Sequence, residues 1–184
     1  AAFAEVGVGE KNMANYVLNE QAILAGYDRA GLDREYDNRA KVADAGAISE
    51  RWLVNGKAAR ASMSCSLDVP YGSHERHKLD IFPVSKPGAP ILAFVHGGYW
   101  HMRDKTLVHF IAPFYVAAGI NFISIGYRLC PEVGIGDVVE DVRDALGWAH
   151  GHAADFGGNA EQLYVAGHSA GGHLAAMMCG PSGM

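Results

Sequence analysis

The chain has 184 residues, of which 49% are hydrophobic and 19% charged, a composition typical of a globular domain with one core. The formal net charge of -5 and the lack of a lysine- or arginine-rich run argue against nucleic acid as a partner. The apolar runs are too short to cross a membrane, and no basic segment precedes the apolar start as in a signal peptide.

Residues 1–60 carry the weakest pattern, and we predict that they cap a sheet core at 61–184 within a single domain, 1–184. The predicted cap elements are a helix at 12–26, an exposed turn or short helix at 32–39, and a short helix at 48–53. Trp52 of the last helix is expected to pack on the main body. Whether the cap only covers the domain or also walls a pocket stays open.

Strand patterns begin after Ala61. Ser62 to Val69 alternates loosely and His77 to Phe82 alternates clearly, and both runs stop at turn residues. They are predicted to form an antiparallel pair at a sheet edge. Pro90 to Val95 is a continuous apolar run, typical of a central parallel strand that is buried on both faces.

Helices and strands then alternate to the end of the chain. We predict a helix at 104–118 capped by Asp104, a strand at 120–125, a helix at 137–154, a strand at 162–166 and a helix at 170–178. The apolar face of the first of these helices is predicted to comprise Leu107, Phe110, Ile111 and Phe114. This alternation predicts an α/β fold with a doubly wound, mostly parallel sheet.

One motif follows the last predicted strand. Gly167-His168-Ser169-Ala170-Gly171 fits the G-x-S-x-G pattern of a nucleophile elbow, a sharp turn from a strand into a helix. In such a turn the serine takes a strained backbone conformation, and its hydroxyl stands above the sheet. We therefore predict that Ser169 is a catalytic nucleophile.

A second motif, His96-Gly97-Gly98-Tyr99-Trp100, directly follows the central apolar strand. Ligands of doubly wound sheets bind beyond the C-terminal strand ends, so His96 and Ser169 should lie at the same edge. Two glycines there can turn their N–H groups toward a ligand. With the N–H of Ala170 they are predicted to form an oxyanion hole. His96 is expected to shape the turn.

The residues that should activate the serine are not evident. A serine needs a base, normally a histidine oriented by a carboxylate, and in this fold both follow the serine in sequence. No Asp or Glu follows Ser169, and His173, one helical turn further on, is poorly placed and is predicted to be structural. His168 is expected to point away from the reacting centre. The chain is therefore predicted to be an N-terminal fragment that is truncated after the elbow helix and nearly inactive by itself.

No cofactor or metal site is predicted. The three cysteines, Cys65, Cys130 and Cys179, have no C-x-x-C spacing, and the nine histidines include no H-E-x-x-H motif. Reduced thiols are typical of a cytoplasmic protein, and we predict that location. The expected partner is a small-molecule substrate, with no nucleic acid and no membrane, and a homodimer is an open option.

The motifs HGGYW and GHSAGG resemble those of the α/β-hydrolase superfamily. Within it, the chain resembles the hormone-sensitive-lipase-like esterases and, more closely, the kynurenine formamidase (arylformamidase) branch. Residues 32–39 and 77–82 resemble segments of that branch, and 126–132 resembles the Y-R-L-x-P-E loop of these esterases. The family's acid and histidine have no counterpart here.

The resemblance implies an enzyme of tryptophan catabolism that hydrolyses an aryl formamide, such as N-formylkynurenine, through an acyl-serine intermediate and releases formate. It implies that Ser169 is the nucleophile, and that Gly97, Gly98 and Ala170 form the oxyanion hole. Tyr99 and Trp100 would bind the substrate. Two alternatives stay open: a carboxylesterase that acts on small esters, and a non-catalytic binding module that keeps the elbow geometry.

Overall fold

The computed structural model describes residues 26–180, and the chain divides into two compact units, Ala1–Gly46 and Ala47–Met184. In the first unit, helix α1 (Arg29–Tyr36) begins where the Asp28 carboxylate accepts a hydrogen bond from the N–H of Gly31 at 2.6 Å. This helix is the short exposed helix predicted near 32–39. Most of the helix predicted at 12–26 lies outside the described residues. The predicted single domain with a cap at 1–60 stays a prediction.

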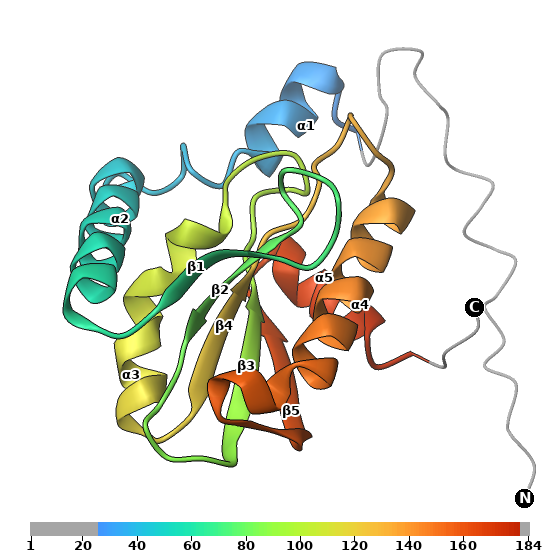
Figure 1. Cartoon of the computed structure of the whole chain (residues 1–184). Coiled ribbons are helices and arrows are strands. Elements are labelled where there is room, and N and C mark those ends of the chain that lie inside the picture. The colour runs from blue at the N-terminus through green and yellow to red at the C-terminus, as the bar shows by residue number, and fades with distance from the viewer. Residues whose placement is uncertain (1–25, 181–184) are drawn as a thin grey trace, which may run out of the picture. The chain divides into compact units, whose positions relative to one another are not determined.

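The second unit contains a five-stranded sheet with strand order β1-β2-β4-β3-β5 (Figure 1). Its strands are β1 (Ser66–Pro70), β2 (Lys78–Phe82), β3 (Ala89–Val95), β4 (Asn121–Ile125) and β5 (Gly158–Gly167). β1 and β2 are antiparallel and β2 and β4 are antiparallel, whereas β4, β3 and β5 run parallel. The antiparallel pair at the edge and the central parallel strand are thus confirmed.

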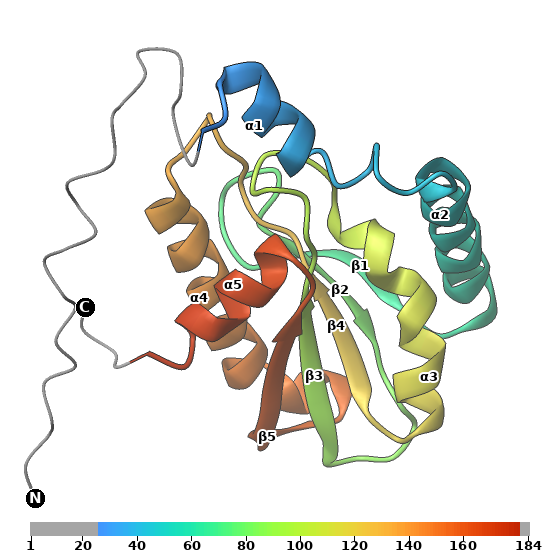
Figure 2. The ribbon, with the colours of Figure 1, turned by 180° about the vertical axis from the view of Figure 1, so that it is seen from behind.

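Helices cover both faces of this sheet (Figure 1 and Figure 2). They are α2 (Ala45–Ser62), η2 (Lys105–Ile111), α3 (Ala112–Ala117), α4 (Ile135–Gly151), η3 (Ala153–Phe156) and α5 (Ala170–Met177). α4 packs on one face, and η2 and α3 pack on the other. The predicted doubly wound α/β fold is therefore confirmed. No helix within residues 26–180 is both long and apolar enough to span a membrane.

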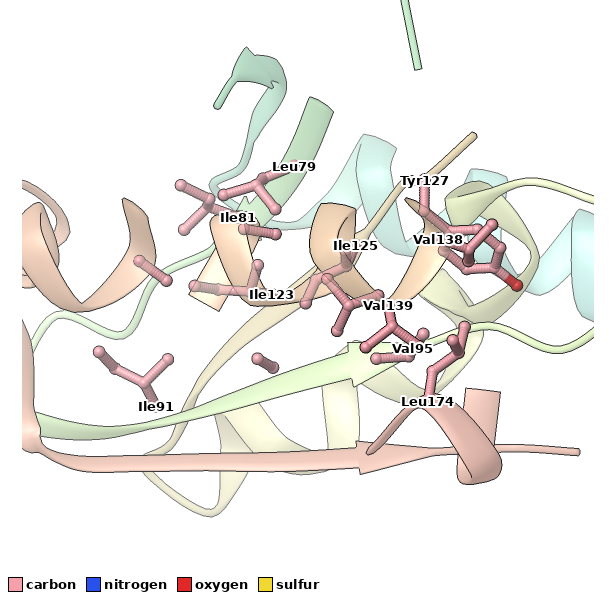
Figure 3. Packing of buried hydrophobic residues seen from close by; sticks show 14 of the residues in the cluster. Leu79, Ile81, Ile91, Val95, Ile123, Ile125, Tyr127, Val138, Val139 and Leu174 are labelled. Carbon is pink, nitrogen blue, oxygen red and sulfur yellow. The ribbon is translucent and has the colours of Figure 1, made fainter. Parts of the chain in front are cut away.

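The core has two layers because alternate residues of the central strands face opposite sides of the sheet. On the α4 side, Val138 of α4 and Leu174 of α5 belong to the same buried cluster as Val95 and Ile125 (Figure 3). The opposite layer consists of Phe82, Val108, Ala112 and Phe122. β3 lies between β4 and β5 and alternates buried with half-buried residues, whereas β5 lies at the edge of the described sheet and is more exposed. The candidate site stands on the C-terminal ends of these two strands.

The prediction of one continuous helix at 104–118 is wrong. Asp104 does cap the segment, accepting from the N–H of Thr106 at 3.0 Å, but a 3₁₀ helix comes first and an α-helix restarts at Ala112. Pro113 explains the break, because proline has no N–H for a mid-helix hydrogen bond but fits a first helical turn. The predicted face shifts accordingly: Phe114 is 74% exposed, and Tyr115 instead stacks on the core.

Several predicted boundaries also move. The helix predicted at 48–53 is part of α2, which extends through Ser62, so the strand predicted from there begins only at Ser66. The segment is rich in alanine and other good helix formers, which prolong the helix. The expected packing of Trp52 is confirmed, since its ring stacks on Phe110 with centroids 5.2 Å apart. α4 ends at Gly151, and β5 starts at Gly158 rather than 162.

Candidate active site

The two glycine-containing motifs lie side by side at the C-terminal edge of the sheet. β3 and β5 are parallel neighbours in a register that pairs Val95 with Gly167, the last residue of each strand. Beyond this pair, the N–H of His168 donates to the carbonyl oxygen of Val95 at 3.2 Å. The prediction that His96 and Ser169 share one edge is confirmed.

Ser169 occupies a sharp turn between β5 and α5. Its φ of 56° and ψ of -122° fall in a region that residues with a side chain rarely adopt. The residue is exposed, and its carbonyl oxygen accepts from the N–H of Gly172 at 2.8 Å, which starts the helix. The strained serine expected of an elbow is therefore present.

Gly97 stands directly beside this serine. A Cβ on Gly97 would lie 2.9 Å from Cβ of Ser169 and 2.7 Å from the carbonyl oxygen of His168. Only glycine fits this space, because real Cβ atoms almost never approach so closely. Among the described residues, the N–H groups of Gly97, Gly98 and Ala170 donate no hydrogen bond to the protein. Three unused donors thus lie on the two motifs that meet at Ser169.

Tyr99 and Trp100 extend the loop after the glycines. Both have positive φ, 50° and 59° respectively, which is uncommon for large side chains. Tyr99 is exposed, whereas Trp100 is half-buried and its carbonyl oxygen accepts from the N–H of Cys130 at 2.8 Å. The indole meets the His173 ring edge to face, with centroids 5.3 Å apart. The predicted substrate-binding role of both residues stays a prediction.

The histidines near the serine occupy different environments. His173 is exposed and packs against Trp100. His168 was expected to point away from the reacting centre, but its Nδ1 atom would lie 3.1 Å from a Cβ on Gly97. Within residues 26–180, no side chain makes a hydrogen bond with the Ser169 hydroxyl in this structure.

His96 is fully buried and directly precedes the segment 97–103, which follows β3 and is called the glycine loop below. Its Nδ1 lies 2.8 Å from the carbonyl oxygen of Gly97, and because a carbonyl can only accept, Nδ1 carries the proton. Burial lowers the pKa of His96 to about 4, although its hydrogen bond with Gly97 opposes this shift. The imidazole is therefore neutral at neutral pH, and the expectation that it shapes the turn fits these contacts.

The lowered pKa of His96 predicts an acid-dependent loss of stability. An unfolded histidine binds a proton near pH 6.5, whereas folded His96 does so only near pH 4, so protonation favours the unfolded chain. We expect the contribution of His96 to the free energy of unfolding to be fully present above pH 6.5. This contribution should fall by about 3 kcal/mol as the pH drops to 4. Urea titrations of the full-length protein at several pH values would measure this loss.

The control is His96→Asn, whose amide keeps a donor near the Nδ1 position but does not titrate. This variant should lack the part of the pH dependence that lies between pH 6.5 and 4. The pKa values of Asp80, Asp104 and Asp141 all lie below the ordinary range, so their stabilisation is lost only at still lower pH. An equal pH slope in the wild type and the variant would contradict the assignment.

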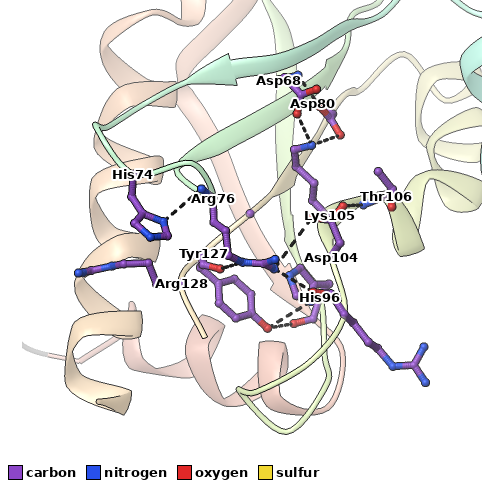
Figure 4. A network of polar contacts seen from close by, with 12 residues as sticks. Asp68, His74, Arg76, Asp80, His96, Asp104, Lys105, Thr106, Tyr127 and Arg128 are labelled. Atoms are coloured by element: carbon purple, nitrogen blue, oxygen red, sulfur yellow. Dashed lines mark hydrogen bonds and ion pairs between the residues drawn. The ribbon is translucent and has the colours of Figure 1, made fainter. Parts of the chain in front are cut away.

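Arg76, in the connection between β1 and β2, forms hydrogen bonds with the glycine loop and with the segment after β4. The sequence analysis did not identify this residue. Its Nε donates to the carbonyl oxygen of Tyr127 at 2.7 Å (Figure 4). Its Nη2 donates to the carbonyl oxygen of Arg103 at 2.8 Å. Arg103 has a φ of 78°, so this contact holds a strained residue of the loop. No sequence signal marks an arginine that binds two distant backbone carbonyls.

A Ser-His-Asp group that does not include Ser169 lies within the sheet layer, but its geometry is not that of a catalytic triad. The Nε2 atom of His109 lies 2.9 Å from a carboxylate oxygen of Asp80 and 3.0 Å from the hydroxyl of Ser124. A triad histidine contacts its acid and its serine through different nitrogens. Here Arg60 occupies Nδ1 at 2.8 Å, and all of Ser124, His109 and Asp80 are buried. The group is structural.

Lys105 completes this buried cluster. Its ammonium lies 3.0 Å from Asp80 and 2.7 Å from Asp68. Burial alone would raise the pKa of Asp80, but hydrogen bonds, led by that from His109, outweigh burial and lower it. The charges of Lys105 and the two carboxylates are thus paired. The contacts of Lys105 and His109 with Asp80 connect η2 to strand β2. Within residues 26–180, no three His, Cys, Asp or Glu side chains are arranged to hold a metal ion.

Comparison with known proteins identifies the family of this fold and site. Residues 79–183, which include both glycine motifs, match the family model described as BD-FAE. The chain belongs to the BD-FAE family. Among solved structures, this chain is similar to a candidate thioesterase from a Silicibacter species, with a TM-score of 0.73 and 34% identity. That match covers 82% of this chain and 56% of the other.

The curated relatives are hydrolases of esterase or formamidase type. The chain is 35% identical over 122 residues to a kynurenine formamidase from Danio rerio, and the match covers 65% of this chain and 40% of the relative. It is 36% identical over 110 residues to a probable isoprenylcysteine alpha-carbonyl methylesterase from Oryza sativa subsp. japonica, covering 59% and 26%. The chain thus spans well under half the length of these relatives. Together with the sheet and the structural match, these relatives confirm the α/β-hydrolase fold.

Proposed function

We propose that the full-length protein is a serine hydrolase that cleaves an aryl formamide, with Ser169 as its nucleophile. The observation that carries this proposal is the position of Gly97 directly beside Ser169, with unused N–H groups on Gly97, Gly98 and Ala170. When a serine oxygen attacks a carbonyl, negative charge develops on the carbonyl oxygen, and preorganised N–H donors stabilise it. Each such donor contributes about 3 to 4 kcal/mol in comparable enzymes.

The proposed reaction has two steps. The Ser169 oxygen bonds to the formyl carbon as a general base takes the hydroxyl proton, and the carbonyl electron pair moves to its oxygen. The tetrahedral intermediate collapses, the C–N bond breaks, and the departing arylamine takes that proton. Water then attacks the formyl-serine, the base takes a proton from it and returns one to Ser169, and formate leaves. We propose that this base lies outside the described residues.

The choice of a formamide rests on the relatives and on the loop after the glycines. Kynurenine formamidases from Danio rerio and Salmo salar are 35% and 34% identical over 122 residues. The aromatic residues Tyr99 and Trp100 follow the two glycines, and we propose that they contact the aryl group. A carboxylesterase that acts on small esters is the second candidate, because the methylesterase relatives and a carboxylic ester hydrolase from Mycobacterium tuberculosis match at similar identity.

A fluorophosphonate probe and two substrates test the proposal. We expect the full-length protein to gain one phosphonyl group, which peptide mapping places on Ser169. An aryl formamide should then be hydrolysed with a higher kcat/KM than the matched aryl acetate. If Ser169 is labelled but the aryl acetate has the higher kcat/KM, the result supports the carboxylesterase. If the protein is neither labelled by the probe nor able to hydrolyse either substrate, the formamidase and the carboxylesterase proposals are both refuted. The non-catalytic binding module then remains.

A further inference from the structure

Tyr127 lies beneath the glycine loop and is fully buried, although it follows a different strand, β4. Its hydroxyl donates to the carbonyl oxygen of His96 at 2.7 Å (Figure 4). Its ring stacks on the His96 imidazole with centroids 4.3 Å apart and planes 13° from parallel. Burial raises the pKa of the Tyr127 hydroxyl, so it stays protonated and remains a donor.

This contact fixes the direction of an N–H group. In a trans peptide the C=O and the following N–H lie in one plane and point in opposite directions. Because the carbonyl of His96 points at Tyr127, the N–H of Gly97 points away from it. The imidazole of His96 holds the next carbonyl, that of Gly97, at 2.8 Å, which orients the N–H of Gly98 in the same way.

The loop needs such an anchor because its backbone is strained. Gly98 has a φ of 131°, and Tyr99 and Trp100 follow with φ values of 50° and 59°. Residues in these regions persist only where surrounding contacts hold them, because the backbone conformation is unfavourable for any residue that carries a side chain. Without the Tyr127 hydroxyl, the peptide between His96 and Gly97 loses its hydrogen-bonding partner and can rotate, which turns the N–H of Gly97 away from its present direction.

We propose that Tyr127 is a positioning residue that holds the N–H of Gly97 in the direction required to stabilise the oxyanion, acting through the carbonyl of His96. The proposal rests on the proposed function of Ser169. Tyr127 touches no reacting atom in this scheme, and it acts on the transition state rather than on substrate binding.

The test is Tyr127→Phe in the full-length protein, which removes the hydroxyl and keeps the buried ring. We expect kcat to fall about 10- to 100-fold, the size of effect that a misplaced catalytic group produces, with KM changed less than about threefold. Affinity for a boronic acid that mimics the tetrahedral intermediate should fall by the same factor as kcat. An unchanged kcat in the folded variant would overturn the proposal.

Tyr71→Phe is the matched control. The Tyr71 hydroxyl also donates to a backbone carbonyl at 2.7 Å, but that carbonyl belongs to Gly126, outside the glycine loop. Both variants lose one hydrogen bond and some stability, yet only Tyr127→Phe should lower kcat. Equal losses of kcat in both variants would indicate a structural role and refute the proposal. Full activity in Ser169→Ala would instead refute the proposed function itself.

Discussion

Replacement of Ser169 by alanine is expected to lower kcat/KM of the full-length protein by about ten-thousandfold to a millionfold. The substitution removes the oxygen that forms the acyl intermediate. In the proposed reaction neither His168 nor His173 takes its place as the nucleophile. Alanine keeps the exposed turn and removes no hydrogen bond of the serine side chain within the described residues. Steady-state kinetics with an aryl formamide and an aryl ester measure the effect.

Ser124→Ala is the control for this experiment, because Ser124 also lies close to a histidine and an aspartate. Its hydroxyl is buried and bonds to Nε2 of His109 at 3.0 Å, and it belongs to β4 and not to the elbow or to the loop after β3. The variant should lose about 1 kcal/mol of stability and keep kcat/KM within about threefold. If Ser124→Ala abolished activity and Ser169→Ala did not, the nucleophile would be assigned to the wrong serine.

Gly171→Ala is expected to have the largest effect on stability, a loss of at least about 3 kcal/mol or failure to fold. A Cβ at this position would lie 2.6 Å from the carbonyl oxygen of His96, and still closer to that of Val95. Both obstacles are backbone atoms at the end of β3, so they cannot rotate aside as a side chain would. Thermal and urea unfolding of the full-length protein measure the loss.

The adjacent Gly172 provides the matched control on the same helix. A Cβ there would lie 3.4 Å from the carbonyl oxygen of Gly167, an ordinary contact. Gly172→Ala should therefore be neutral, or stabilise the protein by up to about 1 kcal/mol through its higher helix propensity. Equal destabilisation by both substitutions would contradict the close approach of α5 to β3.

Much of the fold could be predicted from the sequence because strands and helix ends are encoded by residues that lie close together in the chain. The apolar run before His96 had to be a central strand, since an unbroken hydrophobic segment of that length needs burial on both faces. Asp104 was recognised as a helix cap because capping involves residues two or three positions apart. The helix break at Pro113 could also have been read from the sequence, since proline lacks the N–H that a continuous helix requires.

The sequence by itself determined that a strand leads into the elbow, that its serine is strained and that two glycines follow another strand, because each depends on residue types at short spacing. Only the tertiary structure decided the strand order that makes β3 and β5 neighbours. Only the tertiary structure placed Tyr127 under His96 and Arg76 against the loop from Gly97 to Arg103. It also separated the buried Ser124 group from the exposed Ser169. These contacts join residues far apart in the chain through backbone carbonyls, which every residue carries and which therefore leave no signature in the sequence.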